Sequence, residues 1–404
     1  MVGAGASGLV AAHELRCAGH QVTVFERSAE IGGVWVYDEA PGRTMYASLR
    51  TNLPRDLMAF RSYPFDSRGG GADDQPRFPT HEVVLAYLRR FADDRDLIGL
   101  IRFETEVVDI DETPTGWAVR TRRDGVEDGH EFAAIAVCNG HFTVPREIEI
   151  AGSAEFPGVV VHSRDYRHPG PFVGMRVATV GVGSSGLDLS LEIATVAEHV
   201  YWCGHTSADE RTVPAVDRLS PIPMPDRLTS DGLLVVGDRR IPVDAVMLCT
   251  GFHYDLSFIA EGIVAGDDAP TSLYRHLLPV GHPTMALIGI PQRIIPFPLF
   301  EMQAKWFAAI LSGEVTLPAL VERRAWLEEW AAHCRSESRE PYQCRNLGAE
   351  QFDYIDELAA ECGAQPLPDW YRPLAQETTA SRLGNLLEYR DLPLTTKGDS
   401  RVSL

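Results

Sequence analysis

The sequence predicts an α/β protein with two related domains, the second inserted into the first. Two observations support this prediction. A glycine-rich loop that runs into a helical pattern occurs twice, at residues 3–8 and 181–186. Two buried strands also end alike, in Cys138-Asn139-Gly140 and in Cys249-Thr250-Gly251. A repeated unit of strand, loop and helix is typical of doubly wound parallel sheets.

The first loop, Gly3-Ala4-Gly5-Ala6-Ser7-Gly8, has the spacing G-x-G-x-x-G and precedes a helical pattern over residues 9–15. Its first two glycines permit a tight turn and a close approach of the backbone to a pyrophosphate, and the third allows close packing of helix on strand. The next strand, residues 21–26, ends in Glu26, where an acid typically binds ribose hydroxyls. The first unit therefore indicates a dinucleotide site.

The strand before this loop is abnormally short. Only Met1 and Val2 precede Gly3, whereas a strand of about five residues is usual. Two explanations are open: a misplaced start codon with residues missing, or a weakened nucleotide-binding domain.

The second loop has its full context, with a strand over residues 176–180 and a helix over residues 187–197. The strand that follows, residues 199–203, ends without an acid, which favours NADP over NAD because no carboxylate requires a free 2′-hydroxyl. His205 and Arg211 are candidate partners of the 2′-phosphate. The chain is thus predicted to hold two Rossmann-like dinucleotide-binding domains of the three-layer ββα type.

Composition narrows the functional classes. The 404 residues and 45% hydrophobic content suffice for two domains, and a net charge of −20 argues against nucleic acid or an anionic membrane as partner. Seven cysteines without a C-x-x-C motif indicate a reducing compartment and neither a zinc site nor a redox-active dithiol. With no leader before Gly3 and no apolar run of about eighteen residues, we expect a cytoplasmic protein without a membrane anchor.

Periodicity predicts further elements. Residues 81–94 form an amphipathic helix with Val84, Leu88 and Phe91 on its apolar face and Thr80 as its cap. Asp124-Gly125 is expected to turn a hairpin, and the Gly-rich residues 68–76 to form an exposed loop. Three later helices are predicted at residues 302–311, 318–333 and 350–361. Their expected core positions include Leu320, Leu327 and Ala331, and Phe352, Ile355 and Leu358.

At residues 156–166 the chain reads Phe-Pro-Gly-Val-Val-Val-His-Ser-Arg-Asp-Tyr, which resembles the F-x-G-x-x-x-H-x-x-x-(Y/F) fingerprint of flavin-containing monooxygenases. This segment stands shortly before the second glycine loop, as in that family. Further matches are Gly32-Gly33-Val34-Trp35, Thr51-Asn52-Leu53-Pro54, Cys249-Thr250-Gly251-Phe252 and Glu301-Met302-Gln303-Ala304-Lys305-Trp306, and the resemblance extends from Gly3 to about Tyr371.

The resemblance implies FAD in a discontinuous domain, residues 1–160 and 285–404, and NADPH in an inserted domain, residues 161–284. In this family NADPH reduces the flavin, O2 adds to form a flavin hydroperoxide, and a small amine or sulfide takes the distal oxygen. A homodimer is compatible with the family. The cofactor carries the chemistry, in keeping with a sequence that offers no catalytic triad, carboxylate pair or metal-ligand spacing.

The same resemblance assigns residues to sites. Asn52, whose amide would hold the hydroperoxide, is the one catalytic assignment. His162 of the fingerprint is assigned to an interdomain linker rather than to a base. The FAD side comprises Gly3, Gly5, Ser7, Gly8, Glu26, Gly33, Val34, Trp35, Thr51, Asn52 and Leu53, and the NADP side comprises Gly181, Gly183, Ser185, Gly186, Leu187 and Asp188.

Three alternatives are open. A Baeyer–Villiger monooxygenase shares both loops, but its fingerprint usually closes with Trp rather than with the Tyr166 found here. A flavin disulfide reductase needs paired cysteines beside the flavin, where only Cys17 stands. A flavin-poor binding protein without activity would follow from loss of the first strand.

Overall fold

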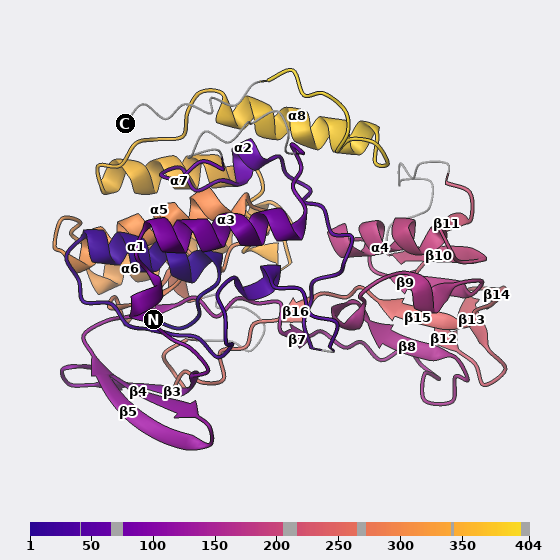
Figure 1. The fold of residues 1–404 in the computed structure, drawn as a ribbon, viewed down its shortest axis with the longest axis horizontal. Coiled ribbons are helices and arrows are strands. Elements are labelled where there is room, and N and C mark those ends of the chain that lie inside the picture. The colour runs from indigo at the N-terminus through magenta and orange to yellow at the C-terminus, as the bar shows by residue number, and fades with distance from the viewer. Residues whose placement is uncertain (41, 66–75, 205–215, 265–271, 341–342, 397–404) are drawn as a thin grey trace.

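A parallel sheet lies at the centre of each of two lobes (Figure 1). The computed structural model describes residues 1–40, 42–65, 76–204, 216–264, 272–340 and 343–396. The predicted residues His205 and Arg211, the glycine-rich loop at 68–75 and the last eight residues lie outside these ranges.

The sheet of the larger lobe contains β2 (Ile101–Arg102), β1 (Val24–Phe25), β6 (Ile135–Val137) and β19 (Met285–Leu287). β1 pairs with β2 and β19 pairs with β6, both in parallel. Val2 bridges Phe25 on one side and Val137 on the other, so the first residues of the chain fill the central position.

Met1 and Val2 make the backbone hydrogen bonds of a central strand. The Val2 amide donates to Ala136, and the Val2 carbonyl accepts from Cys138, at 3.0 and 2.8 Å. On the other side the Gly3 amide donates to Phe25 at 2.8 Å, and the Met1 carbonyl accepts from Phe25 at 3.0 Å. The short segment therefore holds the glycine loop in register with both neighbouring strands.

The smaller lobe repeats this arrangement. Its five parallel strands follow the order β11-β10-β9-β15-β8, with β9 in the place that Val2 takes in the larger lobe. Each lobe adds a three-stranded antiparallel sheet, β3-β4-β5 in one and β12-β13-β14 in the other. The bounds are β3 Glu106–Thr113, β4 Gly116–Arg123, β5 Val126–Phe132, β8 Val159–His162, β9 Arg176–Val180, β10 His199–Gly204, β11 Leu219–Pro223, β12 Arg227–Leu228, β13 Leu233–Val236, β14 Arg239–Pro242 and β15 Ala245–Leu248. The predicted pair of three-layer α/β units is confirmed.

The remaining strands are short. β7 (Val144–Pro145) pairs with β16 (Phe252–His253) where the lobes meet, and β17 (Leu273–Tyr274) pairs with β18 (Leu278–Pro279). Tyr254, Ile259 and Ile263 follow β16 and pack in one core with Ile110, Trp117 and Met285 of the larger lobe. The division of the chain at residues 160 and 284 stays a prediction.

Most predicted helices are present. α3 (His81–Asp94) buries Val84, Leu88 and Phe91 completely, with Thr80 at its N-cap position. The predicted hairpin turn holds Asp124 and Gly125 at φ of 50° and 78°. The helices that follow the two loops are α1 (Ala6–Cys17) and α4 (Ser184–Ala194), and further helices are α2 (Arg55–Met58), α5 (Pro296–Leu311) and α7 (Glu350–Glu361), which buries Phe352, Ile355 and Leu358.

The predicted core face of one C-terminal helix was wrong. α6 (Leu320–Ser336) does not bury Leu320, Leu327 and Ala331; it turns Arg323, Trp326, Trp330 and Cys334 inward, and Leu320 is 38% exposed. The indole rings of Trp326 and Trp330 bury more apolar area than the predicted residues would, which explains why this face of α6 packs against the core. A helix that the sequence did not predict, α8 (Tyr371–Gly384), follows Cys362 and buries Tyr371 and Leu374.

Candidate active site

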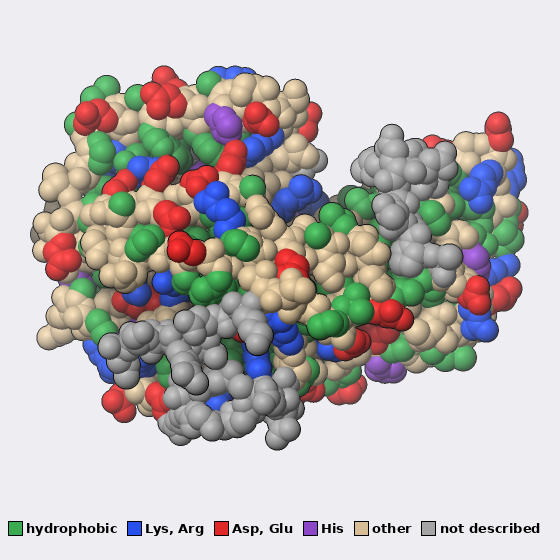
Figure 2. Space-filling model, turned by 90° about the horizontal axis from the view of Figure 1, so that it is seen from above, with side chains coloured by type: hydrophobic (Ala, Val, Ile, Leu, Met, Phe, Trp, Pro, Cys, Tyr) green, Lys and Arg blue, Asp and Glu red, His purple; other side chains and the backbone are tan. Residues whose placement is uncertain are grey.

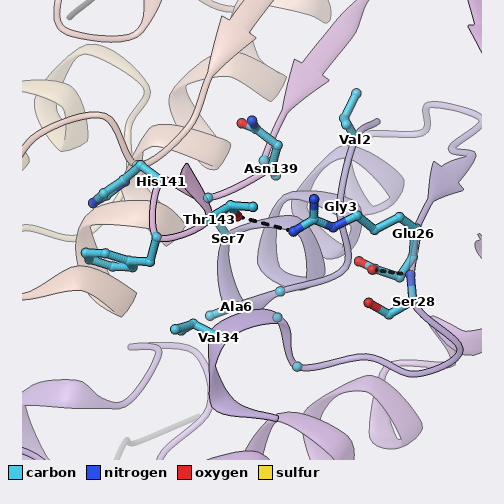
Figure 3. A pocket seen from close by; sticks show the side chains of 18 of the residues that line it. Val2, Gly3, Ala6, Ser7, Glu26, Ser28, Val34, Asn139, His141 and Thr143 are labelled. Carbon is cyan, nitrogen blue, oxygen red and sulfur yellow. Dashed lines mark hydrogen bonds between the residues drawn. The ribbon is translucent and has the colours of Figure 1, made fainter. Parts of the chain in front are cut away.

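A cavity of about 290 Å³ opens at the carboxyl edge of the first sheet, where ligands bind in open α/β sheets (Figure 3). Its walls include the start of α1, the residues after β1, the 3₁₀ turn Gly33–Trp35, the residues after β6 and after β19, and the start of α5. Among the predicted site residues, Gly3, Gly5, Ser7, Glu26, Gly33, Val34 and Trp35 line the cavity.

The glycines of the first loop have distinct roles. Gly3 has φ of +94°, and a Cβ there would lie 2.5 Å from the Cys138 carbonyl oxygen. A Cβ at Gly8 would lie 2.0 Å from the Gly3 carbonyl oxygen. These two positions therefore exclude any side chain because the chain itself fills the space.

Gly5 is different, since its backbone is extended and lines the cavity. A Cβ on Gly5 would lie 3.6 Å from the Gly33 Cα atom, which is an ordinary contact. Gly33 approaches from the facing turn with φ of +57°. Because neither glycine has a side chain, the backbone at the N-terminus of α1 is bare, that is, no side chain of these residues covers it. The first turn of α1 contains no acidic residue. Such a helix end attracts a phosphate.

Glu26 is buried at the end of β1 and anchors the loop. Its Oε2 atom accepts a hydrogen bond of 2.7 Å from the Ala4 amide, and its Oε1 atom accepts one of 2.8 Å from the Ser28 amide. Figure 3 shows the pair of Glu26 and Ser28 at one end of the cavity and His141 at the other. A carboxylate keeps acceptor capacity beyond two bonds, so Glu26 fits a ribose hydroxyl as well.

The second loop reproduces the geometry of the first. Gly181 has φ of +129°, and a Cβ there would lie 2.2 Å from the Cys249 carbonyl oxygen, as Gly3 does toward Cys138. A Cβ on Gly186 would lie 2.0 Å from the Gly181 carbonyl oxygen. At Gly183, the counterpart of Gly5, nothing lies within 4 Å. Both loops thus present one bare glycine before a helix.

The cavity wall away from Glu26 is apolar. Trp35 packs edge-on against Phe297 of α5, with ring centroids 6.1 Å apart. Val34 is 36% exposed and Phe142 is 47% exposed, although both are large apolar side chains that line the cavity. A flat aromatic ligand would cover this surface, as an isoalloxazine ring requires.

Two titratable groups at the cavity are held neutral. Burial, with the charge of Arg345, lowers the pKa of His141 from 6.5 to about 4. Burial raises the pKa of the Cys138 thiol from 9.0 to about 12. Neither group is charged near pH 7, so the described wall offers neither an imidazolium acid nor a thiolate nucleophile. All seven cysteines are free, and Cys17 lies on the surface, which argues against a disulfide reductase.

Thr51, Asn52 and Leu53 do not line this cavity; they lie on the side of the larger lobe that meets α4. Thr51 is buried, and its hydroxyl donates to the Leu53 carbonyl at 2.8 Å. Arg390 joins Thr51 to Asp188: its Nε atom donates to the Thr51 carbonyl at 3.0 Å, and its Nη2 atom pairs with the Asp188 carboxylate at 2.9 Å. Arg390 was not predicted from the sequence.

The fingerprint segment forms β8 and connects the lobes. His162 Nδ1 accepts from the Arg164 amide at 3.0 Å, and Nε2 contacts the Gly251 carbonyl oxygen at 3.1 Å. Both ring nitrogens are therefore used within the protein. Burial lowers the pKa of His162 below 6.5, so a neutral ring joins the ends of β8 and β15.

The Glu301–Trp306 motif supports the cavity from behind, within α5. Gln303 is fully buried; its side-chain oxygen accepts from the Gly289 amide at 2.9 Å, and its amide donates to the Tyr354 hydroxyl at 2.8 Å. Because Gly289 lines the cavity, Gln303 fixes one wall segment to α7.

The flavin-binding monooxygenase-like family model matches residues 1–209 and 230–371. The chain belongs to this family. It is 34% identical to flavin-containing monooxygenase FMO GS-OX-like 4 of Arabidopsis thaliana, over 97% of this chain and 93% of the relative. It is also similar to the structure of S-allyl-L-cysteine S-oxygenase from Allium sativum, with 37% identity, a TM-score of 0.91, and coverage of 97% and 94%.

A third comparison concerns the fold. The structure of Tmm from Pelagibacter sp. strain HTCC7211 superposes with a TM-score of 0.88 at 22% identity, covering 99% of this chain and 94% of that one. The family match and the relatives at 34% and 37% identity show that the protein is a flavin-containing monooxygenase, an oxidoreductase that uses FAD and NADPH. The bare backbone at Gly5 and at Gly183 fits two phosphate-bearing cofactors.

Two searches of the described residues were negative. In the part of the chain that the structure describes, no helix is both long and apolar enough to cross a membrane. Within the same ranges, no group of three His, Cys, Asp or Glu side chains is placed to hold a metal ion.

Proposed function

We propose that the protein is an NADPH- and O2-dependent S-oxygenase that converts a small organic sulfide into its sulfoxide. The observation that carries the proposal is the combination of two equivalent glycine loops, each with one bare glycine before a helix, and a cavity whose wall away from Glu26 is apolar and whose His141 and Cys138 are neutral near pH 7. A sulfide is a neutral, soft nucleophile, so its attack needs no base to remove a proton.

The residues divide into two cofactor sites. Gly3, Gly5, Ser7 and Gly8 hold the FAD pyrophosphate at α1, Glu26 binds the ribose, and Gly33, Val34 and Trp35 flank the ring system. Gly181, Gly183, Ser185, Gly186 and Leu187 hold the NADPH pyrophosphate at α4, with Asp188 behind them. When bound, the flavin accepts a hydride from NADPH and activates O2 for transfer of one oxygen atom.

Thr51, Asn52 and Leu53 separate the two sites. Asn52 is half-buried, and within the described ranges its side chain makes no hydrogen bond to another residue. Its amide both donates and accepts without giving up a proton, so it steadies activated oxygen without promoting release of peroxide. His141 lines the FAD cavity and is neutral near pH 7, so no imidazolium at this position delivers a proton.

Sulfur is favoured over nitrogen by the relative from Allium sativum, whose name states S-oxygenation of S-allyl-L-cysteine. The decisive experiment incubates purified FAD-loaded protein with NADPH, O2 and one of three substrates: S-allyl-L-cysteine, a tertiary amine or a cyclic ketone. The sulfoxide is the expected product. An N-oxide or a lactone formed in place of the sulfoxide would refute S-oxygenation, the lactone indicating Baeyer–Villiger chemistry.

Asn52→Ala tests the role given to the amide. We expect NADPH to reduce the flavin at an unchanged rate, while hydrogen peroxide replaces sulfoxide as the main product. Asn52→Asp is the matched control because it keeps the shape of the side chain but cannot donate. If Asn52→Ala kept the wild-type ratio of sulfoxide to peroxide, Asn52 would have no such role.

A further inference from the structure

The contact between the lobes contains a basic side chain, Arg390, that belongs to neither glycine loop. The segment after α8 extends from the larger lobe to α4 of the smaller one, where Arg390 meets Asp188 (Figure 1). Figure 2 shows a notch between the lobes, with basic side chains of the larger lobe at its edge. Arg382, in the last turn of α8, donates to the Ser184 hydroxyl at the start of α4 at 3.2 Å.

Arg390 is largely enclosed in this contact. Its side chain and that of Asp188 are each 18% exposed, and their charged atoms lie 2.9 Å apart. The guanidinium also lies over the Tyr389 ring, 4.9 Å from the centroid. By comparison, the neighbouring pair of Arg50 and Asp391 leaves Asp391 69% exposed. An enclosed pair is screened little by salt, and loss of one partner leaves the other charge uncompensated.

The two partners of Arg390 lie on two segments that the proposed function places beside the cofactors. Asp188 lies one turn inside α4, two residues after Gly186, and Thr51 directly precedes Asn52. The Arg390 Nη2 atom binds the first and its Nε atom binds the carbonyl of the second. The planar guanidinium offers both donors in a fixed fork, whereas an ammonium group is a point charge that cannot reproduce this geometry.

We propose that Arg390 is a positioning residue that fixes the Thr51–Leu53 turn against the NADPH-binding helix α4. This inference rests on the proposed function, because it gives α4 and Asn52 their cofactor roles. Transfer of hydride and of oxygen requires reactants aligned to within a fraction of an ångström, and a misplacement of about 1 Å costs about a hundredfold in rate. Arg390 acts on both sites without touching either reacting group.

The first test needs neither substrate nor turnover. Amide hydrogen exchange is measured on flavin-free and FAD-loaded Arg390→Gln protein, in peptides that cover residues 46–53 and 184–194. We expect about tenfold faster exchange in both peptides. This factor corresponds to a free energy of local opening that is lower by about 1.4 kcal/mol. A peptide over α7 should be unchanged. Unchanged exchange at residues 46–53 would overturn the inference.

The second test measures coupling. We expect Arg390→Gln to form about tenfold less sulfoxide per hydrogen peroxide, with wild-type FAD content. Arg390→Lys should restore the pair with Asp188 but not the coupling, because it loses the bond to Thr51. Full rescue by lysine, or a coupling loss that comes with loss of FAD, would refute the positioning role.

Two comparisons complete the design. Arg372→Gln is the matched control, since Arg372 pairs with Asp353 on the surface of the larger lobe, away from α4. The double variant Arg390→Gln/Asp188→Asn should be no worse than Arg390→Gln alone if both residues act through one contact. If wild-type protein formed no oxygenated product, the proposed function would fail, while faster exchange in Arg390→Gln would still establish the contact.

Discussion

Gly183→Ala is expected to weaken NADPH binding without disturbing the fold. Residue 183 has φ of −72°, which alanine adopts freely, and an added Cβ would meet nothing within 4 Å. The methyl group would instead occupy the space through which the nucleotide phosphates reach the start of α4. We expect less than about 1 kcal/mol of lost stability, since neither glycine nor alanine caps the helix with a side chain.

The size of the binding effect follows from the hydrogen bonds lost. Backbone amides that donate to a charged phosphate contribute about 1.5–3 kcal/mol each, so loss of one raises the KM for NADPH by about ten- to a hundredfold. FAD content should not change, because Gly5 and Gly33 form the separate FAD cradle.

Gly181→Ala is the contrasting variant. Its φ of +129° is poorly accessible to alanine, and its Cβ would lie 2.2 Å from the Cys249 carbonyl oxygen. We expect a loss of about 2–5 kcal/mol from the left-handed backbone and the overlap together. Steady-state kinetics, FAD absorbance and thermal unfolding of the two variants distinguish the effects. A normal KM in Gly183→Ala, or full stability in Gly181→Ala, would refute the geometry of the second loop.

Three further predictions concern the larger lobe. Glu26→Gln should lose FAD on gel filtration. The side-chain NH2 group would face the backbone amide of Ala4 or Ser28, so that this amide loses its acceptor at a cost of about 1–3 kcal/mol. Full retention of FAD would contradict this prediction. Burial lowers the pKa of His276 from 6.5 to about 4, so its neutral ring stabilises the fold above pH 6.5 and this contribution, about 3 kcal/mol, is lost as the pH falls toward 4. His276→Asn, chosen because asparagine tolerates the φ of 54°, should flatten the dependence of the unfolding free energy on pH over that window, and an unchanged slope would speak against it. Iodoacetamide at pH 7.5 should label exposed Cys17 but leave Cys138, whose pKa of about 12 keeps it protonated, unmodified by mass spectrometry.

The repeated parts of the molecule could be predicted from the sequence because local spacing encodes them. Gly3 and Gly181 allow no side chain, because a Cβ at either position would overlap the carbonyl oxygen of Cys138 or Cys249 at the end of a neighbouring strand. α3 was equally readable, since Val84, Leu88 and Phe91 keep a helical period. Glu26 was identified from its distance along the chain alone.

The parts that escaped prediction depend on long-range contacts or on unusual buried residues. Arg390 meets Asp188 across 202 positions, and no local pattern marks such a pair. The inward face of α6 contains Arg323, a residue type that sequence reasoning assigns to the surface. For α8 a signal existed, since Tyr371, Leu374, Ala375 and Thr378 recur at helical spacing.

Incorporation of oxygen from labelled O2 tests the central claim most directly. Purified FAD-loaded protein is incubated with NADPH, S-allyl-L-cysteine and ¹⁸O2. Mass spectrometry then gives the isotope content and the amount of the sulfoxide, and this amount is compared with the amount of NADPH consumed. The account predicts sulfoxide with one ¹⁸O atom for each NADPH oxidised. Unlabelled sulfoxide, or NADPH converted entirely into hydrogen peroxide while the sulfide stays intact, would contradict it.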